Sequence, residues 1–209
     1  HDDDEVWRFA AERSWQAPGF EQDDAHPVTC ISWYDARAYL HWLSVETRAN
    51  YRLPSEAEFE LFVEAENSKA SLLAATACQV ANGADLASPF RYHNRACRDG
   101  YRYTAPVASF SANAFGLHDT RGNVWEWVED CWSEGIASWW YRLLYARSDG
   151  SPWQRSDCRF RLGRGGAWLS SLGNLEVLAR RPSPPAYRLT SMGFRVVREL
   201  PASNPGKPQ

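Results

Sequence analysis

The sequence predicts an irregular, loop-rich α+β domain with two main helices and short antiparallel strands. The 209-residue chain is 44% hydrophobic, which is enough for one core. Only two stretches space their apolar residues as an amphipathic helix does. Twelve prolines and thirteen glycines interrupt the rest of the chain, and eleven tryptophans are spread along it. This composition excludes a helical bundle.

Both predicted helices lie in the first third of the chain. Residues 35–48 repeat apolar side chains at three- and four-residue steps. The second helix begins at Ser55, because Ser55 and Glu58 form the pattern of a capping box. The apolar positions of the two helices are Ala36, Tyr39, Leu40 and Leu43, and then Phe59, Phe62 and Val63.

Short strands and long loops are expected in the remainder. Strand-like stretches are apolar or β-branched and are bounded by turn residues. Two adjacent glycines, Gly165 and Gly166, allow another backbone to approach closely. Long loops are expected at residues 68–103 and 132–158. The expected strands are residues 27–33, 105–110, 160–168 and 192–198.

The charge is nearly balanced overall but uneven along the chain. A net charge of −3 gives no general attraction to nucleic acid, and no apolar run reaches the roughly 20 residues of a membrane span. Residues 1–24 hold eight acidic residues against two arginines, whereas residues 155–200 hold nine arginines against three acidic residues. The second stretch is either a solvated basic face or a groove for an anionic or peptide ligand.

The segment Gly116–Trp127 combines turn residues with carboxylates. Gly122 and Asn123 tolerate positive φ, and Asp119 and Glu126 lie within one short loop. Carboxylates with backbone carbonyls are the ligands that calcium prefers. From the spacing alone, the alternative is a solvated turn that carries two core tryptophans.

Several motifs, in order, resemble the formylglycine-generating enzyme (sulfatase-modifying factor) family. The resemblance runs from about Pro27 to Arg198 and implies a C-type-lectin-like fold. It divides the chain into an acidic segment 1–26, a sulfatase-modifying-factor-like domain 27–200 and a tail 201–209. Segment 1–26 is aromatic enough to drape on the domain, and it is either the remnant of a longer N-terminal part or a short form. The motifs are Tyr51-Arg-Leu-Pro-Ser-Glu-Ala-Glu58, Thr104-Ala-Pro-Val107, Asn113-Ala-Phe-Gly-Leu117, Gly122-Asn-Val-Trp-Glu-Trp127, Arg164-Gly-Gly-Ala-Trp168 and Gly193-Phe-Arg195.

The resemblance also implies two structural calcium sites. Each would combine two side chains with two backbone carbonyls from a turn, as calcium requires. The first corresponds to the side chains of Asp119 and Glu126 with the carbonyls of Gly122 and Val124, and the second to the side chains of Asn82 and Asp99 with the carbonyls of Gly83 and Tyr101.

The five cysteines lack the short pair spacing of a zinc site. Two lie in each long loop, which favours Cys78–Cys97 and Cys131–Cys158 among the three connectivities that four cysteines allow. Cys30, in an apolar stretch, is expected to be a buried free thiol. Two disulfides imply an exported protein, periplasmic or secreted.

The copper chemistry of the resembled family requires two cysteines between Trp168 and Gly193. None is present, and Gly173 and Leu178 align with those positions. Because a thiolate is both the copper(I) ligand and the redox group, no copper is expected. The family's sulfoxide synthases use three histidines, largely from an extra helical domain that is absent here. The sequence's own histidines His26, His41, His93 and His118 are scattered.

The resemblance therefore leaves three functions open. The first is a maturation or modification factor for a secreted peptide or peptide-derived substrate, which would bind near Trp125, Trp168 and Arg180. Glu176 would serve as its base, unless it simply pairs with an arginine. The second is a ligand-binding module like the retroelement-diversified variable proteins, with Leu169–Met192 as the variable segment. The third is a catalytically inactive accessory paralogue.

Overall fold

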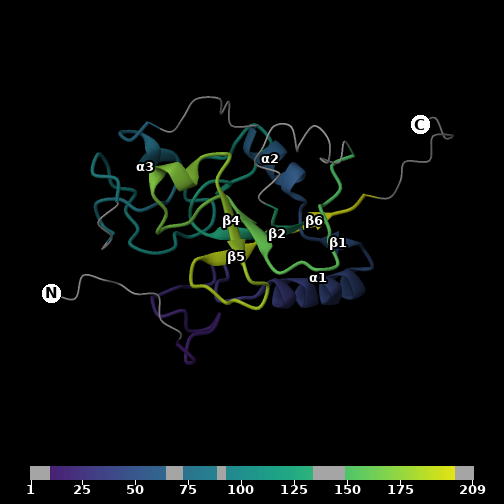
Figure 1. Ribbon diagram of the computed structural model, residues 1–209. Coiled ribbons are helices and arrows are strands. Elements are labelled where there is room, and N and C mark those ends of the chain that lie inside the picture. Colours follow the sequence, from purple (N-terminus) through teal and green to yellow (C-terminus); the bar gives the residue numbers. More distant parts are fainter. Residues whose placement is uncertain (1–9, 65–72, 89–92, 134–148, 201–209) are drawn as a thin grey trace.

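The computed structural model describes residues 10–64, 73–88, 93–133 and 149–200 (Figure 1). It confirms the expected loop-rich α+β class. Within these residues the elements follow the order α1 (Trp33–Thr47), β1 (Tyr51–Arg52), α2 (Glu56–Glu64), α3 (Ala77–Val80), β2 (Trp125–Cys131), β3 (Arg161–Arg164), the 3-10 helix η2 (Leu172–Leu175), β4 (Arg180–Ser183), β5 (Met192–Phe194) and β6 (Val197–Arg198).

The two main helices begin at capping boxes. Ser32 accepts a hydrogen bond from the Asp35 backbone N–H at 3.1 Å, and the Asp35 carboxylate accepts one from Ser32 N–H at 2.8 Å. Ser55 and Glu58 repeat this exchange at 3.1 and 2.8 Å ahead of α2. Each box satisfies N–H groups that the first helical turn leaves unpaired. α1 ends where Arg48 takes a left-handed φ of 54°.

The central sheet has the strand order β4-β3-β2-β5 and is mixed. β2 pairs with β3 in the antiparallel sense and with β5 in the parallel sense, so Glu126 lies opposite both Arg164 and Gly193. β1 and β6 form a separate antiparallel pair. The expected single strand over 192–198 is therefore wrong, since it divides between two sheets.

Two other expected strands do not form. Over residues 27–33, Cys30 has a left-handed φ of 57° and Trp33 already begins α1, so the buried segment cannot stay extended. Over 105–110, Ala105 bonds through both N–H and C=O to the Asn123 side chain rather than to a neighbouring strand. The expected strand 160–168 shortens to β3, because Gly165 and Gly166 both have positive φ.

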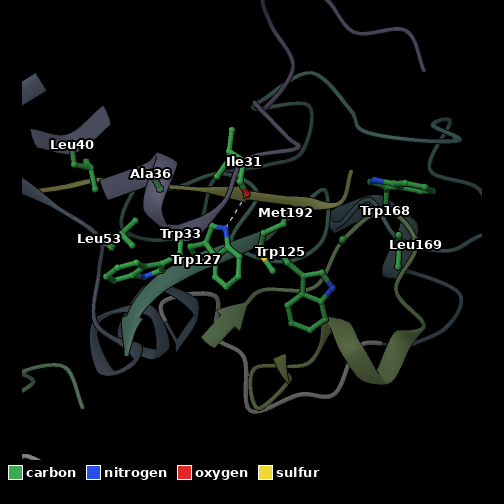
Figure 2. Close-up of a cluster of buried hydrophobic side chains, with 11 residues drawn as sticks. Ile31, Trp33, Ala36, Leu40, Leu53, Trp125, Trp127, Trp168, Leu169 and Met192 are labelled. Carbon is green, nitrogen blue, oxygen red and sulfur yellow. Dashed lines mark hydrogen bonds between the residues drawn. The ribbon is translucent and has the colours of Figure 1, made fainter. Parts of the chain in front are cut away.

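Tryptophans of β2 and α1 organise the core, and Figure 2 shows them around Ile31 and Met192. Trp127 is fully buried and donates its indole N–H to the carbonyl of Ile31 at 3.2 Å. Trp33 donates to the carbonyl of Val128 at 3.0 Å. These bonds offset the cost of burying the indole N–H, and they attach the segment before α1 to the central strand.

Both expected disulfides form, Cys78–Cys97 and Cys131–Cys158, and Cys30 is a buried free cysteine. From residue 10 onward the N-terminal segment drapes on the domain as expected, since Phe20 stacks on Tyr103 with ring centroids 4.7 Å apart. Residues 1–9 and the tail 201–209 lie outside the described residues. No helix in the described ranges has the length and apolar character needed to cross a membrane.

Candidate functional site

The two loops that resemble calcium sites lie side by side. Asn82 and Gly122 form a parallel backbone bridge, and Asn123 N–H donates to the carbonyl of Asn82 at 2.9 Å. A Cβ at Gly122 would stand 2.1 Å from the Asn82 carbonyl oxygen, so only glycine fits there. The fold thus joins two segments about 40 residues apart in sequence into one neighbourhood.

Asp119 lies in a loop, but Glu126 lies on β2 and not in the same loop as expected, and an arginine already supplies positive charge beside them. Both Glu126 oxygens accept hydrogen bonds from Arg195, at 2.5 and 2.6 Å. Arg195 also donates to the carbonyls of His118 and Asp119. Asp119 Oδ2 accepts the Ala108 N–H at 2.7 Å, while its buried Oδ1 has no hydrogen-bond partner among the described residues. Burial raises the pKa of Asp119.

In the loop that contains Asn82 and Asp99, no arginine bonds either side chain among the described residues. Asp99 accepts backbone N–H bonds from Gly83 at 3.0 Å and Tyr101 at 2.8 Å. Asp85, which sequence reasoning did not select, is buried and accepts the Asp99 N–H at 2.6 Å. Burial raises the pKa of Asp99 to about 6, and the Asp85 charge adds to the effect.

The oxygen atoms of this second loop fit a hard cation. Asn82 donates its amide to the Tyr103 carbonyl at 2.9 Å, but its fully buried Oδ1 has no hydrogen-bond partner in the described part of the chain. An orphaned buried oxygen beside two carboxylates suits calcium, which takes amide, carboxylate and carbonyl oxygens. No group of three His, Cys, Asp or Glu side chains suited to a metal occurs in the described ranges, so carbonyl and amide oxygens would have to complete the ligand set.

Of the residues expected to bind substrate, the two tryptophans lie in the core cluster. Trp125 and Trp168 are 3% and 6% exposed. Trp168 donates its indole N–H to the Thr190 carbonyl at 3.4 Å. The buried indole N–H of Trp125 has no acceptor among the described residues.

Arg180 is held by a buried carboxylate instead of facing an open site. Its guanidinium donates to both oxygens of Glu56, at 2.6 and 2.9 Å, and lies 4.5 Å from the Trp132 ring centroid. The fully buried Arg164 adds contacts to Glu56 at 3.6 Å and Glu60 at 3.3 Å. Sequence reasoning missed this network, although Glu56 lies inside one of the quoted motifs.

Comparison with known proteins identifies the family. The model of the sulfatase-modifying factor enzyme 1-like domain matches residues 3–200. The chain belongs to the sulfatase-modifying factor family. It is 33% identical over 203 residues to a formylglycine-generating enzyme of Thermomonospora curvata, covering 87% of this chain and 60% of that protein. It is 27% identical over 215 residues to the inactive C-alpha-formylglycine-generating enzyme 2 of Bos taurus, covering 97% of this chain and 60% of that protein.

Solved structures agree with this assignment to the sulfatase-modifying factor family. The structure of PvdO from Pseudomonas aeruginosa has a TM-score of 0.71 and 33% identity, over 88% of this chain and 66% of that one. The Treponema denticola variable protein 1 has a TM-score of 0.65 at 20% identity, over 84% and 72%, and so shares the fold alone. The chain spans about 60% of the length of the formylglycine-generating enzyme named above.

In this member of the sulfatase-modifying factor family, the positions aligned with the copper cysteines lie at the surface near η2. Leu178 is 71% exposed, and a Cβ at Gly173 would meet nothing within 4 Å. Glu176, the expected base, is half-buried, and its backbone carbonyl accepts the Ala179 N–H at 2.9 Å. The structure thus brings Glu176 into the η2–β4 turn, four residues before Arg180.

Proposed function

We propose that this protein is an exported maturation or modification factor that acts on a secreted peptide or peptide-derived substrate without the copper–thiol mechanism. The observation that carries the proposal is the distribution of thiols. Residues 169–192 contain no cysteine, four cysteines form disulfides, and Cys30 is buried. Copper(I) would have no thiolate pair in that segment.

The assignment to a secreted substrate is supported by chemistry and by likeness. Two disulfides are typical of proteins that work in oxidising compartments, which favours a periplasmic or secreted location. PvdO matches with high coverage, and one curated relative is named as an inactive formylglycine-generating enzyme. The second likeness is compatible with a family member that does not perform the standard oxidation.

The proposed site lies against Trp125 and Trp168. The Trp125 N–H, which has no acceptor in the described part of the chain, would bind a carbonyl oxygen of the substrate. Glu176 would accept the proton that the reaction releases. Arg180 would support the wall of the site by its bidentate bond to Glu56.

Calcium would act structurally in this proposal. The orphaned oxygens Asn82 Oδ1 and Asp119 Oδ1 support one cation in each loop. Calcium would supply positive charge that holds the two loops, with Asp99 and Glu126 as the carboxylates. The loop with Asn82 and Asp99 is the better candidate, because Arg195 already balances Glu126.

Two measurements test the proposal. A copper(I) titration against a chromophoric chelator should show no stoichiometric copper, and one equivalent bound tightly would overturn the copper-independent mechanism. Disruption of the gene in its host should change the mass of a secreted peptide product. The wild-type gene should restore that product, and a Glu176→Gln gene should not. An unchanged set of secreted peptides would overturn the maturation function.

The engagement of Arg180 by Glu56 favours a second candidate, a ligand-binding module without chemistry. In that case the purified protein would bind a peptide and release it unchanged. Recovery of the bound peptide with its original mass after long incubation, together with full complementation by Glu176→Gln, would select this candidate.

A further inference from the structure

A groove of about 1140 Å³ lies between the N-terminal segment, α1 and the β5–β6 connection, away from the expected cleft residues Trp125, Trp168 and Arg180. This volume exceeds the range of roughly 300–1000 Å³ typical of small-molecule pockets, so it has room for several side chains. Its principal lining residues are Arg13, Trp15, Val28, Tyr39, Phe194 and Val196.

Large apolar side chains of this groove are left in solvent. Trp15 is 58% exposed and Tyr39 is 46% exposed, and Val28 and Val196 are also exposed. The Tyr39 ring packs edge-on against Phe194 with centroids 5.7 Å apart, which fixes an aromatic wall on the side of α1. A contiguous apolar surface of this kind on a soluble protein marks an interaction site.

The charges along the groove are positive in excess. Arg188 is paired with Asp35 at 2.8 Å and Arg195 with Glu126. Arg13 forms no ion pair within the described ranges. Its guanidinium lies over Gly19, where a Cβ would stand 1.2 Å from Nη1, so the absence of a side chain at Gly19 sets its position. Within the described residues, Arg13 is therefore a guanidinium without an ion-pair partner on a groove that has an apolar wall.

We propose that this groove docks a segment of the peptide substrate in which a carboxylate side chain lies next to aromatic or aliphatic side chains. The inference rests on the proposed function, because it assumes a peptide substrate. The carboxylate would accept charge-assisted hydrogen bonds from Arg13, and the apolar side chains would cover Tyr39, Phe194 and Val28. The docked segment of the peptide would therefore lie apart from the residue that is modified.

Binding of a labelled probe peptide, Phe-Asp-Leu-Phe with blocked ends, tests the proposal by fluorescence anisotropy without any turnover. Arg13→Glu should weaken binding of this peptide at least about tenfold, because a charge-assisted bond becomes a repulsion. Gly19→Ala should weaken peptide binding by displacing the Arg13 guanidinium. Tyr39→Asp should weaken peptide binding by removing the aromatic ring that packs against Phe194. Arg95→Glu, an exposed charge reversal outside the groove, is the matched control and should bind as the wild type does.

The Asn analogue of the probe peptide completes a double-mutant cycle. The Asn peptide should bind the wild type about as weakly as the Asp peptide binds Arg13→Glu. Its affinity for Arg13→Glu should be only a little lower than its affinity for the wild type. Since Cys30 also lines the groove, saturating peptide should slow alkylation of this free thiol by iodoacetamide. A melting curve for each variant confirms that it is folded.

Other occupants give distinct results. Absence of peptide binding, or equal binding by Arg13→Glu, overturns the proposal. A large gain in affinity after removal of residues 1–9 would assign the groove to this chain's own N-terminus. A concentration-dependent dimer that Tyr39→Asp dissolves would assign it to a second copy. If the probe peptide binds as expected but disruption of the gene leaves the secreted peptides unchanged, the proposed maturation function is overturned and the docking groove stands.

Discussion

The protein buries carboxylates in two different ways. Beside the central sheet, Glu126 is bonded by Arg195 and Glu56 by Arg180, so each buried negative charge faces a guanidinium. In the loop of Asn82, the buried Asp85 and the half-buried Asp99 carboxylates receive backbone N–H groups and lie near one another. The first arrangement balances its charge internally, whereas in the second no guanidinium bonds either carboxylate among the described contacts.

This difference shows that similar ligand patterns in sequence need not have the same electrostatics in the fold. The Asp119–Glu126 loop and the Asn82–Asp99 loop each combine two side chains with two carbonyls. A guanidinium from β5–β6 reaches only the first loop among the bonds described. Stability should therefore depend on ion pairing around Glu56 and Glu126, and on calcium in the Asn82–Asp99 loop.

The largest effect is expected from Arg180→Met. Removing one partner of a buried ion pair leaves Glu56 poorly compensated, which should lower the free energy of unfolding by about 3–5 kcal/mol. Urea denaturation monitored by tryptophan fluorescence measures this. Arg188→Met is the control, because its pair with Asp35 is exposed and worth less than about 1 kcal/mol. Equal stability of both variants would show that Arg180 is free to serve the substrate instead.

Calcium should matter chiefly in the Asn82–Asp99 loop. At about 100 times its dissociation constant, a ligand stabilises the folded state by about 2.7 kcal/mol, which corresponds to several degrees in Tm. Chelation should therefore lower the Tm of the wild type in a thermal scan, and Asp99→Asn should lose this response. A Tm that is indifferent to calcium and chelator would refute both sites. If the change in Tm on chelation is lost in Glu126→Gln but kept in Asp99→Asn, calcium stabilises the site of Asp119 and Glu126 and not the Asn82–Asp99 loop.

The smallest effect is expected from Asp130, a buried carboxylate next to the compensated network. Burial raises its pKa from 3.8 to about 6, and the nearby Glu56 and Glu129 charges add to this. The folded state therefore binds the proton more tightly, so this contribution is complete below pH 3.8 and is lost as pH rises through about 6. Asp130→Asn should remove this pH-dependent component from unfolding curves measured between pH 4 and 7. An identical pH profile in the variant would contradict it.

Several features could be predicted from the sequence because they depend on local chemistry. The capping box of α2 was predicted, since Ser55 and Glu58, three residues apart, satisfy each other's N–H groups. The box of α1 repeats this local pattern with Ser32 and Asp35 but was not predicted. The two disulfides were predicted from the grouping of the cysteines about two long segments, although Cys78 lies in α3 and Cys131 ends β2. The family followed from motifs in order, and it fixed the fold class.

The partners of buried charges were decided only by the tertiary structure. Arg180 pairs with Glu56, 124 residues away, and Arg195 pairs with Glu126, 69 residues away. Local pattern carries no signal for contacts that the strand order β4-β3-β2-β5 creates. The same holds for the failed strands 27–33 and 105–110, because a left-handed Cys30 and the Asn123 side chain determine their hydrogen bonds. The sequence alone determined the family, the cap of α2 and the covalent bridges, while packing decided which carboxylates are paired with a guanidinium.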